Sequence, residues 1–240
     1  MHNVTLPTSE YEVSEAMYRF IRNKIENQIE GIVRRSILDW PLSFGVETAV
    51  MNNVVGDYHE FGVFRGRSFS KVANLFQKHT RHELFSEMKF WAYDSFAGLP
   101  ETADSYAPSH FEKGAFSASR ELFHKNVTND GVASDQIGVV EGFYDESLTE
   151  DLAKEVFSHR KVAMTYIDCD IYESAVPIFN YLQHGLQVGS VIVIDDWVRH
   201  HCHPMHGIQR AWNEWLQKTP NVKVTKVALS KRIMFVVHQV

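Results

Sequence analysis

Residues 58–69, YHEFGVFRGRSF, contain one carboxylate, two glycines and two arginines where an apolar run stops and a helix is expected to begin. A phosphate-binding loop requires G-x-x-x-x-G-K-[ST], and a dinucleotide fingerprint requires G-x-G-x-x-G. This stretch contains neither pattern, because it reads Glu60-x-Gly62-x-x-x-Gly66. Gly62 permits a ligand to approach the backbone closely, and Gly66 opens the next helix, whose free N–H groups and dipole favour an anion such as a carboxylate.

Two carboxylates indicate which ligand this loop binds. Glu60 beside the loop disfavours a pyrophosphate and suits a ligand with a positive group. Asp94 ends the next expected strand, where it can accept hydrogen bonds from ribose hydroxyls, and Ser68 is expected to cap the helix. An amino-acid cation, a carboxylate and a ribose together describe S-adenosylmethionine (SAM) better than a nicotinamide dinucleotide.

Strand and helix signals alternate along the chain after this loop and the N-terminal region. Short apolar runs predict strands at residues 57–62, 89–94, 136–142, 161–168 and 190–196. Amphipathic stretches predict helices at residues 68–79, 117–127, 146–158, 172–186 and 207–217. This alternation predicts an α/β fold whose mostly parallel sheet carries helices on both faces. Residues 222–240, VKVTKVALSKRIMFVVHQV, predict two strands joined at LSKR, which add a hairpin with one antiparallel strand to the sheet edge.

The N-terminal region is predicted to be a helical extension of the main domain. Apolar residues fall roughly on one face of an expected helix at residues 10–39. The predicted organisation is an extension at residues 1–50 followed by one domain at residues 51–240. The amphipathic helix also makes a homo-oligomer a candidate assembly.

Bulk composition excludes several kinds of partner. The formal net charge of -6 comes from mixed acidic and basic residues, so a nucleic-acid partner is not expected. The two cysteines are too few for a disulfide framework, and the first residues lack a signal-peptide pattern. No apolar run approaches the roughly 20 residues that span a bilayer. These features predict a cytoplasmic protein that does not bind membranes.

Acidic residues end five predicted strands, at the edge where an open α/β sheet binds its ligand. They are Glu60, Asp94, Glu141, Asp168 and the pair Asp195-Asp196. The last three aspartates can converge on one point, where they would repel one another without a cation. Magnesium prefers such hard oxygen ligands, so the three predict a metal site. The alternative, in which aspartates only cap the following helices, stays open for Asp170.

Five segments together resemble a known family. They are EFGVFRGRSF (60–69), AYDSFAGLPE (92–101), EGFYDESL (141–148), YIDCDIYES (166–174) and VIVIDDW (191–197). In order and spacing they resemble the macrocin and mycinamicin O-methyltransferases, a family of class I SAM-dependent methyltransferases, over about residues 55–217. The resemblance implies a Rossmann-like, seven-stranded sheet, SAM as methyl donor, and a divalent metal, usually magnesium, that holds the acceptor hydroxyl.

The resemblance also implies roles for individual residues. Together with the loop itself, which adds Arg65 and Ser68, it gives expected cofactor-binding residues at Glu60, Gly62, Arg65, Gly66, Ser68, Asp94, Ser95, Gly142 and Phe143. Of these, Glu60, Gly62 and Gly66 would line the methionine end of SAM and Asp94 its ribose. Ser95, Gly142 and Phe143 would lie near the adenine. The expected metal ligands are Asp168, Asp195 and Asp196.

The expected reaction is methyl transfer to a sugar hydroxyl of a glycosylated small molecule or saccharide. A neutral hydroxyl is a poor nucleophile, so a metal and a base must make it more alkoxide-like. Candidate bases are Asp170, His110 and the histidines of residues 198–207, VRHHCHPMHG, here called the histidine loop. The residues predicted to take part in catalysis are Asp168, Asp170 and His201.

The histidine loop also permits a zinc reading, although its spacing fits no standard ligand pattern. We expect it to cover the acceptor site together with residues 1–50 and 101–120. Two other functions remain as alternatives. One is a nicotinamide-dependent oxidoreductase, which the missing third glycine disfavours, and the other is a SAM-binding protein without catalytic activity.

Overall fold

The computed structural model describes residues 23–25, 27–29, 40–79, 86–228 and 232–240, and the chain divides into two compact units, Met1–Trp40 and Pro41–Val240. Of the helix predicted at residues 10–39, residues 23–25 and 27–29 are helical, and the other positions lie outside the described residues. Residues 41–51 are helical as well. Because Leu42, Val46 and Ala49 are buried in the core of the second unit, this helix belongs to the main domain and not to the predicted extension.

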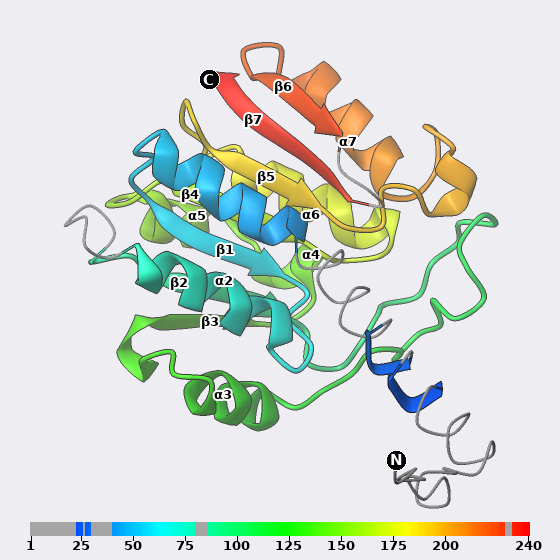
Figure 1. The fold of residues 1–240 in the computed structure, drawn as a ribbon. Helices are drawn as coiled ribbons and strands as arrows, with labels where there is room; N and C mark the ends of the chain where they lie inside the picture. Colours follow the sequence, from blue (N-terminus) through cyan, green and yellow to red (C-terminus); the bar gives the residue numbers. More distant parts are fainter. Residues whose placement is uncertain (1–22, 26, 30–39, 80–85, 229–231) are drawn as a thin grey trace, which may run out of the picture. The chain divides into compact units, whose positions relative to one another are not determined.

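Within the described residues the second unit contains one seven-stranded sheet in the order β3-β2-β1-β4-β5-β7-β6 (Figure 1). The strands are β1 (Asp57–Phe61), β2 (Phe90–Asp94), β3 (Ile137–Glu141), β4 (Val162–Ile167), β5 (Val191–Ile194), β6 (Lys223–Ala228) and β7 (Ile233–Gln239). Neighbouring strands pair in parallel along β3, β2, β1, β4 and β5, and β7 is antiparallel to both β5 and β6. The predicted mostly parallel sheet with an antiparallel edge hairpin is confirmed.

The helices follow the predicted order. They are α2 (Arg67–Lys78), α3 (Arg120–Asn129), α4 (Tyr144–Ser147), α5 (Glu150–Phe157), α6 (Tyr172–Leu182) and α7 (Gly207–Lys218). The helix predicted at residues 146–158 is two helices, because the Thr149 side chain accepts a hydrogen bond from the Leu152 N–H and so starts α5. The helix predicted at residues 117–127 begins later, because Ser119 caps it in the same way.

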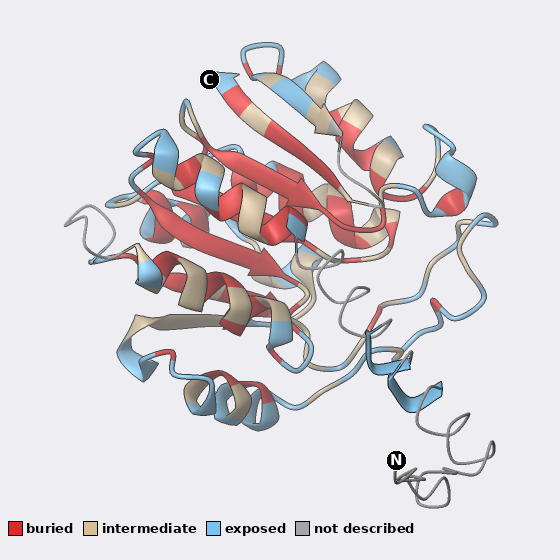
Figure 2. Cartoon of the chain, viewed as in Figure 1, coloured by how far each residue is buried: buried red, intermediate tan, exposed pale blue. Residues whose placement is uncertain are grey.

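Helices cover both faces of the sheet and form two cores. Residues 41–51, α2 and α3 contribute to one apolar cluster, while α5, α6 and α7 contribute to the other. Figure 1 shows residues 41–51 and α2 in front of the sheet and α5 and α6 behind it. The central strands β1, β4 and β5 are therefore buried along their whole length, as Figure 2 shows for β1 and β5.

The described helices of the molecule are too short or too polar for a bilayer span. Their main role here is to connect strands so that β1 to β5 all end at the same edge of the sheet. The loops that leave this edge carry most of the predicted site residues.

Candidate functional site

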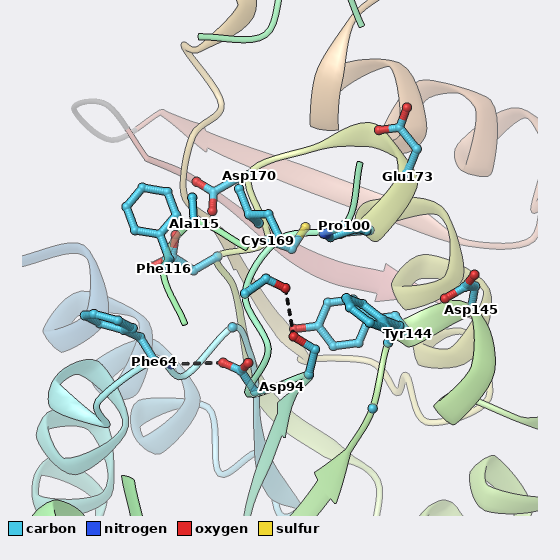
Figure 3. Close-up of a pocket in the computed structure, with 18 of the residues that line it drawn as sticks. Phe64, Asp94, Pro100, Ala115, Phe116, Tyr144, Asp145, Cys169, Asp170 and Glu173 are labelled. Carbon is cyan, nitrogen blue, oxygen red and sulfur yellow. Dashed lines mark hydrogen bonds between the residues drawn. The ribbon is translucent and has the colours of Figure 1, made fainter. Parts of the chain in front are cut away.

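A cavity of about 440 Å³ opens at the carboxyl ends of the parallel strands. Its wall comes from the loops after β1 to β4 and from the segment between β2 and α3; it includes Gly62, Phe64, Asp94, Ser95, Gly98, Leu99, Pro100, Glu101, Ala115, Phe116, Gly142, Phe143, Tyr144, Asp145, Asp168, Cys169, Asp170, Glu173 and Ser174. In Figure 3, Phe64 and Phe116 stand on the side opposite Tyr144. The cavity thus brings the predicted SAM loop, Asp168 and Asp170 to one place.

Gly62 shapes the loop after β1. Its φ angle is +85°, and a Cβ atom there would lie 1.9 Å from the carbonyl oxygen of Asp168. The loop can therefore run directly against the end of β4 only because residue 62 has no side chain. A glycine is needed at position 66 for a different reason, because a Cβ there would clash with Val127 and Phe123 of α3.

Asp94 holds this loop from the neighbouring strand. Its Oδ2 accepts hydrogen bonds from the N–H groups of Val63 (2.8 Å) and Phe64 (3.0 Å), and its Oδ1 accepts one from Phe96 (2.8 Å). Both phenylalanines have positive φ angles, 47° and 52°, which are costly for residues with side chains. A carboxylate has about four acceptor positions, so Asp94 can still accept a hydrogen bond from a ligand hydroxyl.

The structure does not bring Glu60 and Ser68 to the cavity wall. Glu60 is fully buried and points toward α2, where its carboxyl oxygens lie 2.5 Å from the hydroxyls of Ser68 and Tyr58. Burial raises the pKa of Glu60 to about 8, and the two hydroxyls only partly oppose this. The expected Ser68 cap is wrong, because Gly66 occupies the N-cap and no side chain caps the helix.

Two more predicted cofactor residues stand away from the wall. Gly66 is buried against α3, and Arg65 is exposed with its guanidinium 5.0 Å from the ring of Phe64. In contrast, Ser95, Gly142 and Phe143, which are expected near the adenine, all line the cavity, as does Tyr144. The Tyr144 hydroxyl donates to the carbonyl of Tyr93 (3.1 Å) and so fixes that ring.

Asp168, Asp195 and Asp196 converge as the sequence predicts, and we call them the carboxylate set. Each offers one ligand atom, and these atoms lie within 4.8 Å of one another. Burial, followed by the neighbouring aspartates, raises the pKa of Asp168 well above its usual range. Three hard oxygen donors with a shared excess of negative charge fit a divalent cation such as magnesium.

Asp170 lies beside the carboxylate set and lines the cavity. Burial and the carboxyl of Asp196 raise the pKa of Asp170 to about 9. Its φ angle of 64° and that of Asp196, 44°, place both residues in the left-handed region. Asp170 precedes α6 without capping it, because no side chain caps this helix at Ile171. Helix capping therefore does not explain why an aspartate stands here.

Tyr166 and Arg232, which contact the carboxylate set, were not predicted from the sequence. The Tyr166 hydroxyl lies 2.9 Å from Asp195 Oδ2 and 3.1 Å from Asp168 Oδ2. Arg232 Nη2 donates to the same Asp195 oxygen at 3.0 Å. Tyr166 could have been found, because it lies two residues before Asp168 on a strand and so shares its face. Arg232 depends on the sheet register, which the sequence does not reveal.

Asp104 joins the segment between β2 and α3 to the histidine loop. Its Oδ2 accepts a hydrogen bond from the Gly207 N–H (2.9 Å), and its Oδ1 accepts one from the Tyr106 N–H (2.8 Å). The Nδ1 atom of His206 lies 2.8 Å from Oδ1. Burial alone would raise the pKa of Asp104, but these hydrogen bonds outweigh it and lower that pKa. An ionised carboxylate only accepts, so the His206 ring must donate.

The histidines take different positions around this junction. His200 is buried, its Nε2 atom lies 4.0 Å from Asp104 Oδ2, and burial lowers the pKa of His200. His201 is exposed, and its ring stands edge-on to Tyr106 and not at the cavity wall. His110 contacts Phe111 and Phe116. Among the described residues, the side chains that could jointly hold a metal are the three aspartates and include no histidine, so the zinc reading gains no support.

Curated relatives of this chain include two named O-methyltransferases. The chain is 28% identical over 167 residues to the 8-demethyl-8-(2,3-dimethoxy-alpha-L-rhamnosyl)-tetracenomycin-C 4'-O-methyltransferase of Streptomyces olivaceus, a match that covers 67% of this chain and 60% of the relative. It is 22% identical over 160 residues to the mycinamicin III 3''-O-methyltransferase of Micromonospora griseorubida, covering 63% and 59%. The matches thus span about three fifths of these relatives.

Solved structures share the fold. The O-methyltransferase NovP matches with a TM-score of 0.67 and 19% identity over 85% of this chain and 80% of NovP. The calicheamicin methyltransferase CalS11 matches with a TM-score of 0.64 and 16% identity over 98% of both chains.

A family model also matches the chain. The model of the macrocin-O-methyltransferase (TylF) family matches residues 32–228, most of the sequence. The chain therefore belongs to the macrocin-O-methyltransferase (TylF) family.

Proposed function

We propose that this protein transfers a methyl group from SAM to a sugar hydroxyl of a glycosylated small molecule, with a divalent cation at the carboxylate set. The observation that carries the proposal is the single cavity that joins the glycine loop after β1 to the acidic end of β4. The family and the named substrates of its relatives support the reaction class. A nicotinamide oxidoreductase is not favoured, since no such fingerprint is present.

SAM would bind along the loops after β1, β2 and β3. In this proposal Gly62 exposes the backbone to the methionine end of SAM. Asp94 accepts a hydrogen bond from a ribose hydroxyl and also holds the loop through the N–H groups of Val63 and Phe64. Ser95, Gly142 and Phe143 enclose the adenine, with Tyr144 as an additional wall. Glu60 and Ser68 support the loop without touching SAM, because their side chains are hydrogen-bonded to each other and do not line the cavity.

The acceptor hydroxyl would meet the methyl group beside Asp168 and Asp170. The reaction is an in-line displacement at the sulfonium methyl, so the two reactants must be held in one orientation. Asp168, Asp195 and Asp196 would hold the cation, which when bound keeps the carboxylates ionised and polarises a hydroxyl. Asp170 is the preferred proton acceptor over His201, because Asp170 lines the cavity.

Calorimetry tests the donor. SAM should bind the full chain, whereas NADH should not, and magnesium should leave SAM affinity nearly unchanged because the two sites use different side chains. Absence of SAM binding would refute the proposal. Candidate glycosylated acceptors, screened by mass spectrometry for the gain of one methyl group, then identify the substrate.

Asp195→Ala tests the metal. Removing one ligand should lower methyl transfer by about 100-fold or more, while SAM affinity stays within about twofold because Asp195 is outside the cavity wall. Wild-type enzyme treated with a chelator should show the same loss. Full turnover in chelator would show that the reaction needs no divalent cation.

A further inference from the structure

Arg232 reaches the carboxylate set because of the pairing between β5 and β7. Ile194 of β5 pairs with Ile233 of β7 in antiparallel register. The next position outward is therefore Asp195, just after β5, opposite Arg232, just before β7. The edge hairpin, which follows all the recognisable sequence segments, thus contributes a cation to the site.

The contact is close and largely enclosed. Arg232 Nη2 and Asp195 Oδ2 lie 3.0 Å apart, and the two side chains are 10% and 6% exposed. The guanidinium carbon lies 5.3 Å from the ring centre of Tyr166, whose hydroxyl contacts Asp195 and Asp168. The arginine, the tyrosine and two metal-ligand candidates therefore form one connected group.

We propose that Arg232 is a built-in counter-cation and positioning residue, which holds Asp195 ready as a ligand and compensates the carboxylate set before a divalent cation binds. This inference rests on the proposed metal site. Enclosed like charges destabilise a fold unless a cation accompanies them, and an enclosed guanidinium fills that need. A divalent cation held by the same carboxylates would carry the same sign of charge as Arg232, so the metal-bound protein would depend less on the arginine.

This reasoning gives a prediction with a definite sign. In Arg232→Met the uncompensated carboxylates should lower the midpoint of thermal unfolding by about 5 °C or more in a chelator. Magnesium chloride should then raise that midpoint by at least about twice as much as in the wild type, because the metal replaces the compensation that Arg232 gave. Arg232→Lys keeps a charge without the planar fork and should fall between the two.

Two matched arginine variants separate this role from ordinary ion-pair loss. Arg160 pairs with Asp57 at 2.8 Å at the opposite ends of the strands from the carboxylate set. Arg160→Met should therefore lower the midpoint equally with and without magnesium. Arg199 pairs with the metal-ligand candidate Asp196, but its side chain is 44% exposed, so Arg199→Met should have only a small effect.

An Arg232→Met loss that magnesium does not change would overturn the inference and leave Arg232 a purely structural residue. Where the methionine variant does not fold, the same comparison is made with Arg232→Lys. If neither magnesium nor manganese stabilises the wild type, the metal site fails and the inference with it. SAM calorimetry on the same sample then shows separately whether the methyl-donor part of the proposed function stands.

Discussion

Gly62 ties the loop after β1 to the end of β4, since its backbone passes the Asp168 carbonyl with no room for a methyl group. Gly62→Ala should therefore lower the free energy of unfolding by about 3 kcal/mol or more, through the clash and the positive φ angle. SAM affinity should fall as well, because relieving the clash must shift the loop, which lines the cavity. Chemical denaturation and calorimetry measure the two effects.

Gly114 provides the matched control. Its φ angle of +81° is close to that of Gly62, but a Cβ there would meet nothing within 4 Å. Gly114→Ala should therefore cost only the backbone strain, about 1–2 kcal/mol, and leave SAM affinity intact. Equal losses in the two variants would mean that the contact with Asp168 is unimportant.

The histidine loop and the segment between β2 and α3 behave as one element because Asp104 links them. Asp104→Ala removes the acceptor for the N–H groups of Tyr106 and Gly207. Hydrogen exchange of residues 102–110 should then accelerate by about tenfold or more, while the sheet stays protected. Asp151→Ala, whose side chain is 93% exposed, is the control and should not change exchange there.

The same link has a defined pH range. The folded pKa of Asp104 is lowered from 3.8, so its stabilising effect is present above pH 3.8 and is lost as the pH falls through the lower folded value. Protection of residues 102–110 should therefore be as strong at pH 5 as at pH 7. A loss of protection between these values would assign the link to the histidines instead.

At the scale of the whole molecule, Asp57 and the cavity lie at opposite ends of the strands, so we expect changes in stability and in ligand binding to be separable. Asp57 begins β1 and accepts hydrogen bonds from Arg160 Nε (2.8 Å), the Lys89 N–H (3.0 Å) and Trp91 Nε1 (3.1 Å). It is almost fully buried, so Asp57→Ala should lower the free energy of unfolding by about 3–5 kcal/mol. The SAM affinity of the folded variant should stay within about twofold of the wild-type value, because the cavity lies at the other ends of the strands.

Lys154→Ala is the control for this comparison, because its pair with Asp151 is solvent-exposed and should leave the unfolding midpoint unchanged. A large loss of SAM affinity in Asp57→Ala would show that the two ends of the sheet are coupled. Urea unfolding and calorimetry on the same preparations decide the matter.

The sheet was predictable because its strands are short apolar runs bounded by polar turns, and the five parallel strands each carry an acid at or next to their carboxyl end. The carboxylate set was predictable for the same reason, since parallel strands end at one edge. The direction of Glu60 was harder. It shares a strand face with Tyr58, and α2 covers that face, so its carboxyl is bonded to hydroxyls behind the loop.

By itself, the sequence determined the α/β architecture, the ligand edge of the sheet, the glycine loop and the convergence of Asp168, Asp195 and Asp196. These follow from local periodicity and from the rule that parallel strands end together. Only the tertiary structure decided which side chains stand behind those groups. Arg232 meets Asp195 through strand register, and Asp104 meets Gly207 across more than a hundred residues of chain. Such contacts depend on how distant elements pack, and no local pattern encodes them.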